Sequence, residues 1–94
     1  MRTFEILENK QLSAAGTETI AVNICATILS SGRHDGRFSM SIDDLRQAMD
    51  LTDYQTKIAT ARAVERQWVR LFADQIELSA AGIYVAKETL DLPR

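Results

Sequence analysis

Few residues of this chain could carry out covalent chemistry. The 94-residue sequence contains one histidine, His34, and one cysteine, Cys25. A single histidine without cysteine or histidine partners does not make a metal site. The serines Ser13 and Ser79 stand in identical LSAAG strings, which lack the G-x-S-x-G elbow of a serine nucleophile and have no histidine placed as a base. We therefore expect no enzymatic activity, no cofactor and no metal.

The repeated string LSAAG, at residues 12–16 and 78–82, indicates a structural junction. Each copy follows a short apolar run and a polar turn, and each precedes a helix with an apolar stripe. The leucine would close a strand against the core, and the serine would cap the helix. One glycine and no lysine make a poor phosphate-binding loop, so the string bears on the fold.

The composition is that of one soluble globular domain. Hydrophobic residues make up 46% and charged residues 26% of the chain, and the formal net charge is −2. No run approaches the ~18 apolar residues of a membrane helix. The start MRTFEILENK carries acids where a signal peptide has a plain apolar core, so we expect no secretion signal. The apolar neighbours of Cys25 indicate a buried thiol in a reducing compartment. We expect a cytoplasmic protein that binds no membrane.

The first half of the chain predicts a strand, a helix and a loop. TFEIL at residues 3–7 is β-branched and aromatic, which favours a short strand. Apolar residues recur at helical spacing over 14–31, with Ser13 as the N-cap and Gly32 as the stop. The stretch 30–37 is polar and rich in glycine and indicates a loop.

Two helices then follow in close succession. FSM at residues 38–40 predicts a minimal strand, and SIDDLRQAM predicts a helix over 42–49 with Ser41 as its N-cap. Thr52 caps a third helix over 53–68. The turn of three to four residues between them has the spacing of a helix-turn-helix.

The third helix has three distinct faces. Its apolar face, which Glu65 interrupts, comprises Tyr54, Ile58, Ala61 and Trp68. A face roughly 100° away on the helical wheel comprises Gln55, Ala59, Arg62 and Arg66. A further small, polar face comprises Thr56, Thr60, Ala63 and Gln67.

The end of the chain predicts a hairpin and a last helix. VRLF at 69–72 and QIEL at 75–78 flank the tight turn Ala73-Asp74. The second LSAAG string then leads into a helix over 80–90. Its apolar side comprises Ile83, Ala86 and Leu90, with Tyr84 beside it.

The stretch over residues 41–82 resembles a winged helix-turn-helix domain. The resemblance rests on the apolar pattern of the first motif helix, on the turn Leu51-Thr52, and on the pair Trp68-Val69 that enters the hairpin. The hairpin ends in the Leu-Ser-x-x-Gly string with which winged-helix regulators often end their wing. With the helix over 14–31 as the first core helix, the resemblance covers nearly the whole chain.

The resemblance implies one α+β, mainly α, domain over residues 1–94. An N-terminal strand and turn would occupy 1–12, a three-helix core with a hairpin wing 13–78, and a C-terminal helix and tail 79–94. The chain departs from the family in three ways. Glu65 interrupts the apolar register of the helix over 53–68. Gln67 stands where the family usually has glycine, and the wing tip Ala73-Asp74 is acidic where DNA-binding wings often carry lysine or arginine.

The resemblance also implies a transcriptional regulator whose helix 53–68 enters the DNA major groove. The implied contacts are side chains that can pair with bases or meet phosphates: Gln55, Thr56, Lys57, Thr60, Arg62, Arg66, Arg70, Arg33 and Arg37. A repressor of this kind binds as a dimer, and 3–7 and 80–90 are the natural dimer elements because they lie outside the motif.

A second function for the same fold remains open. Residues 32–70 carry only one more basic than acidic side chain, which is little positive charge for a DNA reader. The acidic wing tip Ala73-Asp74 also favours a function other than DNA binding. The alternative is an interaction module or accessory factor that binds another protein and no DNA.

Overall fold

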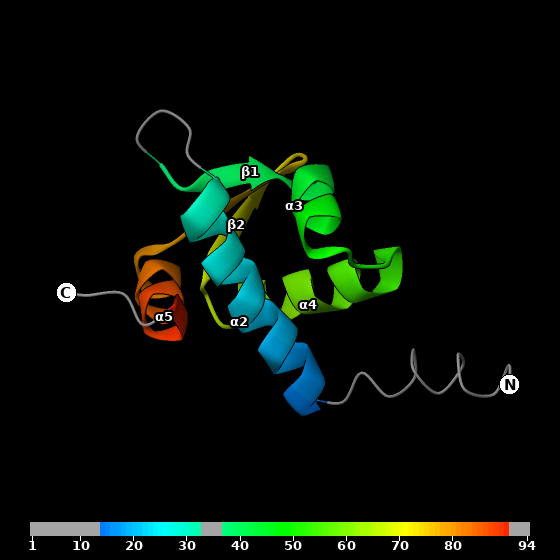
Figure 1. Ribbon diagram of the computed structural model, residues 1–94, viewed down its shortest axis with the longest axis horizontal. Helices are drawn as coiled ribbons and strands as arrows, with labels where there is room; N and C mark the ends of the chain where they lie inside the picture. The colour runs from blue at the N-terminus through cyan, green and yellow to red at the C-terminus, as the bar shows by residue number, and fades with distance from the viewer. Residues whose placement is uncertain (1–13, 33–36, 91–94) are drawn as a thin grey trace, which may run out of the picture.

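The computed structural model describes residues 14–32 and 37–90 (Figure 1). The strand expected over 3–7, the cap Ser13 and the arginine Arg33 lie outside these ranges. The described residues form an α+β fold, mainly α, with four helices and one small sheet. In chain order the elements are α2 (Ala14–Ser31), β1 (Ser39–Ser41), α3 (Ile42–Met49), α4 (Asp53–Glu65), β2 (Val69–Phe72), β3 (Gln75–Leu78) and α5 (Ala80–Leu90).

Helix α2 is the central element, with α5 on one side and α3 and α4 on the other (Figure 1). Its apolar rows are buried, and Ile24, Cys25 and Ile28 are fully enclosed. The helix ends as predicted at Gly32, whose backbone N–H donates to the Ile28 carbonyl at 2.7 Å. The expected helix over 14–31 and the expected burial of the Cys25 thiol are both confirmed.

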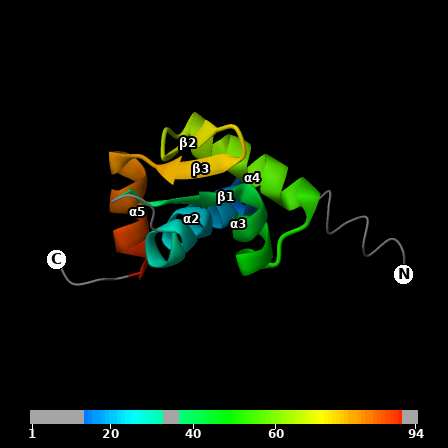
Figure 2. The same ribbon diagram turned by 90° about the horizontal axis from the view of Figure 1, so that it is seen from above.

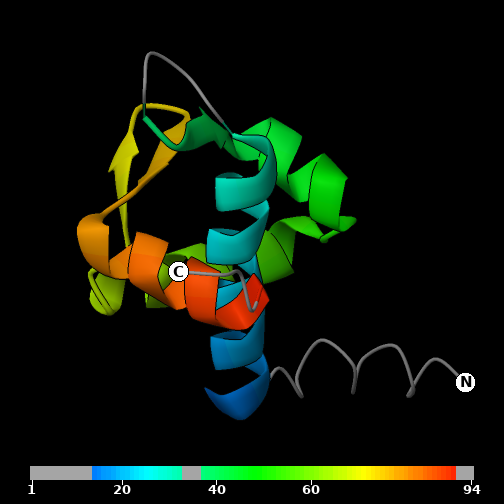
Figure 3. The same cartoon turned by 60° about the vertical axis from the view of Figure 1, so that its left-hand side comes forward.

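The sheet has three antiparallel strands in the order β1-β3-β2. The predicted hairpin is present, and the minimal strand lies at Ser39–Ser41, one residue later than expected. Strand β3 returns to pair with β1, and the Ile42 N–H donates to the Asp74 carbonyl at 2.8 Å. In Figure 2 the strands lie between α5 and α3, and in Figure 3 the hairpin stands on the other side of α2 from α3.

Both predicted caps of the helix pair are confirmed. The Ser41 hydroxyl accepts from the Asp44 N–H at 3.0 Å and starts α3. Thr52 starts α4 with a complete capping box: its hydroxyl accepts from the Gln55 N–H, and the Gln55 side chain accepts from the Thr52 N–H, each at 3.0 Å. Between them Asp50 adopts a left-handed φ of 55° and closes α3.

Helix α4 differs from the sequence prediction in its end and in its buried face. It ends at Glu65 and not at 68, because Gln67 adopts a left-handed φ of 64° and the Trp68 N–H donates to the Ala63 carbonyl at 2.9 Å. Tyr54, on the expected apolar face, is 47% exposed. The buried residues are the small ones, Thr56, Ala59, Thr60 and Ala63. Their short side chains let α4 pack closely against α2. The free energy gained by this close packing outweighs the gain from burying larger side chains on another face of α4.

The second LSAAG string forms the joint between the hairpin and α5. The Ser79 hydroxyl accepts from the Gly82 N–H at 3.1 Å, which confirms its role as a cap. The same hydroxyl lies 2.6 Å from the Gln67 carbonyl oxygen and 3.0 Å from that of Trp68. Gly82 packs so tightly that a Cβ there would overlap the Trp68 carbonyl. Within α5, Ala86 is buried as expected, whereas Tyr84 and Leu90 are exposed.

Candidate nucleic-acid interface

The exposed side of α4 is mixed in charge, because it carries Asp53 and Glu65 as well as Lys57. Tyr54, Lys57 and Ala61 are exposed along it, and Lys57 makes no ion pair with another residue of the described ranges. Gln55 is half-buried, and its carbonyl oxygen is already used by the Thr52 N–H in the capping box. The NH₂ of its amide is therefore the group left for another partner.

The threonines Thr56 and Thr60 belong to the core. Each is only 6% exposed. The Thr56 hydroxyl donates to the Thr52 carbonyl at 2.8 Å, and the Thr60 hydroxyl finds no hydrogen-bond partner within the described residues. Burial removes both side chains from any surface that reaches DNA, which corrects the list implied by the resemblance.

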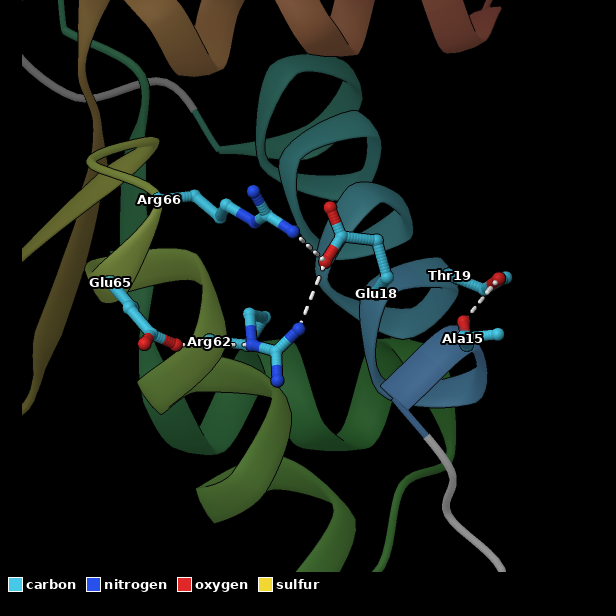
Figure 4. Close-up of polar contacts among 6 residues, drawn as sticks. All are labelled: Ala15, Glu18, Thr19, Arg62, Glu65 and Arg66. Carbon is cyan, nitrogen blue, oxygen red and sulfur yellow. Dashed lines mark hydrogen bonds and ion pairs between the residues drawn. The ribbon is translucent and has the colours of Figure 1, made fainter.

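Two predicted arginines converge on one acid of α2 (Figure 4). Arg62 Nη1 lies 3.2 Å and Arg66 Nη2 3.1 Å from the same oxygen, Oε1 of Glu18. Arg62 Nε also lies 3.1 Å from Oε1 of Glu65. This group, which we call the Glu18 cluster, holds two cations and two anions and therefore has no net charge.

Two further predicted arginines, Arg37 and Arg70, lie apart, on the outer face of the sheet. Arg37 and Arg70 approach the two carboxylate oxygens of Glu77 at 3.7 Å and 4.0 Å. The Arg70 guanidinium also lies 5.9 Å from the centre of the Phe72 ring. Glu77 is 8% exposed although it faces outward, because the long side chains beside it cover it.

The structure thus divides the eight predicted residues that lie within its described ranges into separate groups. Arg62 and Arg66 lie together, Arg37 and Arg70 lie together elsewhere, and Lys57 stands apart from both pairs. Sequence reasoning gave no role to Glu18 or Glu77, the acids around which the arginines gather. The spacing of Arg62 and Arg66 at i and i+4 was the available signal, since it aligns both side chains on one side of a helix.

The hairpin carries an exposed apolar surface. Leu71 is 44% and Phe72 50% exposed, and Val64 at the end of α4 is 40% exposed. These residues line a hollow of about 690 Å³ together with Gln67, Val69, Arg70 and Ser79. This hairpin therefore exposes apolar side chains where DNA-binding wings often carry lysine or arginine.

The Cys25 thiol is buried in the core of the described part. Burial raises the pKa of the Cys25 thiol to about 12, so this thiol is protonated at neutral pH and a poor nucleophile. Within residues 14–32 and 37–90, no three histidine, cysteine or acidic side chains gather as metal ligands would. None of the helices in these ranges has the length and apolar character needed to span a bilayer.

Comparison with known proteins returned no match to a family model, to a curated protein or to a solved structure. Any function assigned to this chain therefore has to rest on its own fold and surface.

Proposed function

We propose that this chain is a winged helix-turn-helix domain that binds double-stranded DNA as a transcriptional regulator. The supporting observation is the arrangement of α3, a tight turn and α4, followed by a hairpin whose second strand pairs with β1. In domains of this kind the second motif helix enters the major groove. The hairpin is then the wing.

Helix α4 has an exposed face suited to that role in shape. Tyr54, Lys57 and Ala61 form a shallow surface at its N-terminal half and middle, and the major groove admits an α-helix of ordinary width. Lys57 would pair with guanine or a phosphate, and the NH₂ of Gln55 with an acceptor on a base edge. In this proposal the exposed residues beside Thr56 and Thr60, and not these two threonines, contact DNA.

The Glu18 cluster limits how strongly Arg62 and Arg66 can bind DNA phosphates. A phosphate oxygen binds guanidinium as a carboxylate oxygen does, so DNA would take the place of Glu18 on Arg62 and Arg66. Exposed ion pairs contribute only about 0–1 kcal/mol each, and the exchange therefore costs little. The affinity should be modest and strongly dependent on salt.

The test is a titration of a labelled random duplex, followed by fluorescence anisotropy. We expect binding at about 50 mM salt that falls steeply toward 200 mM. Lys57→Ala and Arg62→Ala should each weaken it, with a salt slope lower by about one unit per lost phosphate contact. Lys87→Ala, which removes the same charge from α5, is the control and should bind as the wild type does. A wild type without affinity at the lower salt would refute the proposal.

A second function, a protein-binding module on the same fold, is favoured by the surface of the hairpin. Leu71 and Phe72 expose apolar area where a DNA-binding wing exposes cations, and the arginines already have acidic partners within the chain. In that case the duplex titration shows no salt-sensitive binding, and Arg62→Ala has no functional effect.

A further inference from the structure

The two edges of the sheet are built differently. At the β1 edge the end of α2 closes in, and a Cβ on Gly32 would lie 2.7 Å from the Ser39 carbonyl oxygen. The β2 edge instead carries the exposed side chains Leu71 and Phe72. An open apolar edge strand is a template for pairing with another strand.

The backbone groups on the β2 edge follow from the hairpin register. The Ser79 N–H donates to the Trp68 carbonyl at 2.9 Å, and the pairs Arg70–Glu77 and Phe72–Gln75 follow at every second position. Hydrogen-bonded pairs alternate in an antiparallel ladder. The N–H and C=O groups of Val69 and Leu71 therefore point away from β3. Those of Leu71, which is 44% exposed, lie at the open edge, whereas Val69 is only 2% exposed and its part of the edge is covered.

The side chains of β2 divide between the two faces of the sheet. Leu71 lies on the inner face beside Ile76, which in turn pairs with Met40 of β1. Arg70 and Phe72 lie on the outer face, with Glu77 next to Arg70. One row is thus wholly apolar up to the edge, and the other ends in a cation and an aromatic ring.

We propose that β2 pairs antiparallel with β2 of a second copy of this chain, with Leu71 opposite the partner's Leu71. The apolar row Met40-Ile76-Leu71 then continues into the same row of the partner, and the two Leu71 residues exchange both backbone hydrogen bonds. The three-stranded sheet becomes a six-stranded one, and exposed apolar area of both chains is removed from water.

Charge favours this register over the neighbouring one that is centred on Arg70. With Leu71 at the centre, Arg70 faces the partner's Phe72, and a guanidinium over an aromatic ring is favourable. The same contact already exists within one chain, at 5.9 Å. The register that keeps the bonding pattern but centres on Arg70 sets two arginines directly opposite each other, which destabilises a strand pair.

This interface goes beyond the proposed function and differs from a dimer through 3–7 and 80–90. The interface also includes the hollow of about 690 Å³ beside the β2 edge. In the proposed register the partner's hairpin tip lies near Val64, which is 40% exposed beside this hollow.

Disulfide trapping tests the register. Leu71→Cys should form a covalent dimer under mild oxidation, because residues of a hydrogen-bonded pair lie about 5.5 Å apart, within the range that a disulfide spans. Arg70→Cys and Tyr84→Cys are the matched controls and should remain monomeric on a denaturing gel. The native Cys25 is buried and does not interfere. Trapping of Arg70→Cys in place of Leu71→Cys would overturn the register, and trapping of Tyr84→Cys alone would overturn the surface.

Light scattering of the full chain supplies a second readout that needs no cysteine. The wild type should show twice the mass of one chain, and Leu71→Lys half of that, with an unchanged circular dichroism spectrum because this side chain is already half exposed. A wild type that stays monomeric at every concentration would overturn the dimer. The duplex titration is independent: a monomer that binds DNA refutes only the dimer, and a dimer that does not bind DNA refutes only the proposed function.

Discussion

Two different kinds of contact hold helix α4. One is its junction with the hairpin and α5, and the other is its contact with α2 at Glu18. At the junction, backbone carbonyls of Gln67 and Trp68 meet the Ser79 hydroxyl, and Gly82 packs against Trp68 without space for one methyl group. At Glu18 the contact consists of partly exposed ion pairs to Arg62 and Arg66.

The junction contributes to the stability of the fold, whereas the ion pairs at Glu18 can exchange partners. Close backbone packing tolerates no added atom, since interiors are as dense as organic crystals. Exposed ion pairs contribute little and can be exchanged for other anions. We therefore expect substitutions at the junction to change the free energy of unfolding, and substitutions at Glu18 to change binding.

The largest expected effect is that of Gly82→Ala. The new methyl group would overlap the Trp68 carbonyl and force the joint apart, at a cost of about 3 kcal/mol. Thermal unfolding followed by circular dichroism should show Tm lower by about 15 °C. Ala81→Gly, an exposed position in the same helix, is the control and should cost about 1 kcal/mol. Equal effects of the two changes would show that helix propensity, and not the contact with Trp68, governs this joint.

A smaller effect of opposite sign is expected for Gln67→Gly. Gln67 has a φ of 64°, a conformation that costs a side chain with a Cβ about 1–2 kcal/mol. Glycine avoids this cost but loses more entropy on folding, so we expect a net gain of about 1 kcal/mol and a Tm higher by about 5 °C. Gln47→Gly in α3 is the control and should destabilise by about 1 kcal/mol. A fall in Tm for Gln67→Gly would contradict the backbone argument.

The smallest effect on stability is expected for Glu18→Gln, below about 1 kcal/mol in chemical denaturation. Its effect should appear in the duplex titration, where Arg62 and Arg66 no longer lose free energy by leaving a carboxylate. Affinity at low salt should rise several-fold. Glu88→Gln changes the net charge equally on α5 and should leave affinity nearly unchanged. Equal gains from both variants would mean that overall charge, and not the Glu18 cluster, limits binding.

Local signals predicted most of the element boundaries. Ser41 and Thr52 start their helices because their hydroxyls satisfy N–H groups three residues later, and this depends only on nearby sequence. The hairpin turn at Ala73 and Asp74 is equally local. The helices over 14–31, 42–49 and 80–90 therefore match the structure closely.

The faces of α4 could not be predicted in the same way. Tyr54 and Ile58 suggested one apolar side, but the buried side consists of threonines and alanines. Which side of a helix is buried depends on how close its neighbour lies, and small residues permit the closer approach. A side chain such as Thr60 is read as polar in the sequence and becomes part of the core.

By itself the sequence determined most of the places where helices, turns and caps occur, because periodicity and hydroxyl caps act over a few residues. Only the tertiary structure decided the partners of the charged and edge groups. Glu18 pairs with Arg62 although the two residues are 44 positions apart in the sequence. Strand β2 lies at an edge of the sheet because β1 pairs with β3 and not with β2. Such contacts depend on which surfaces the folded chain brings together, and a linear pattern does not contain that information.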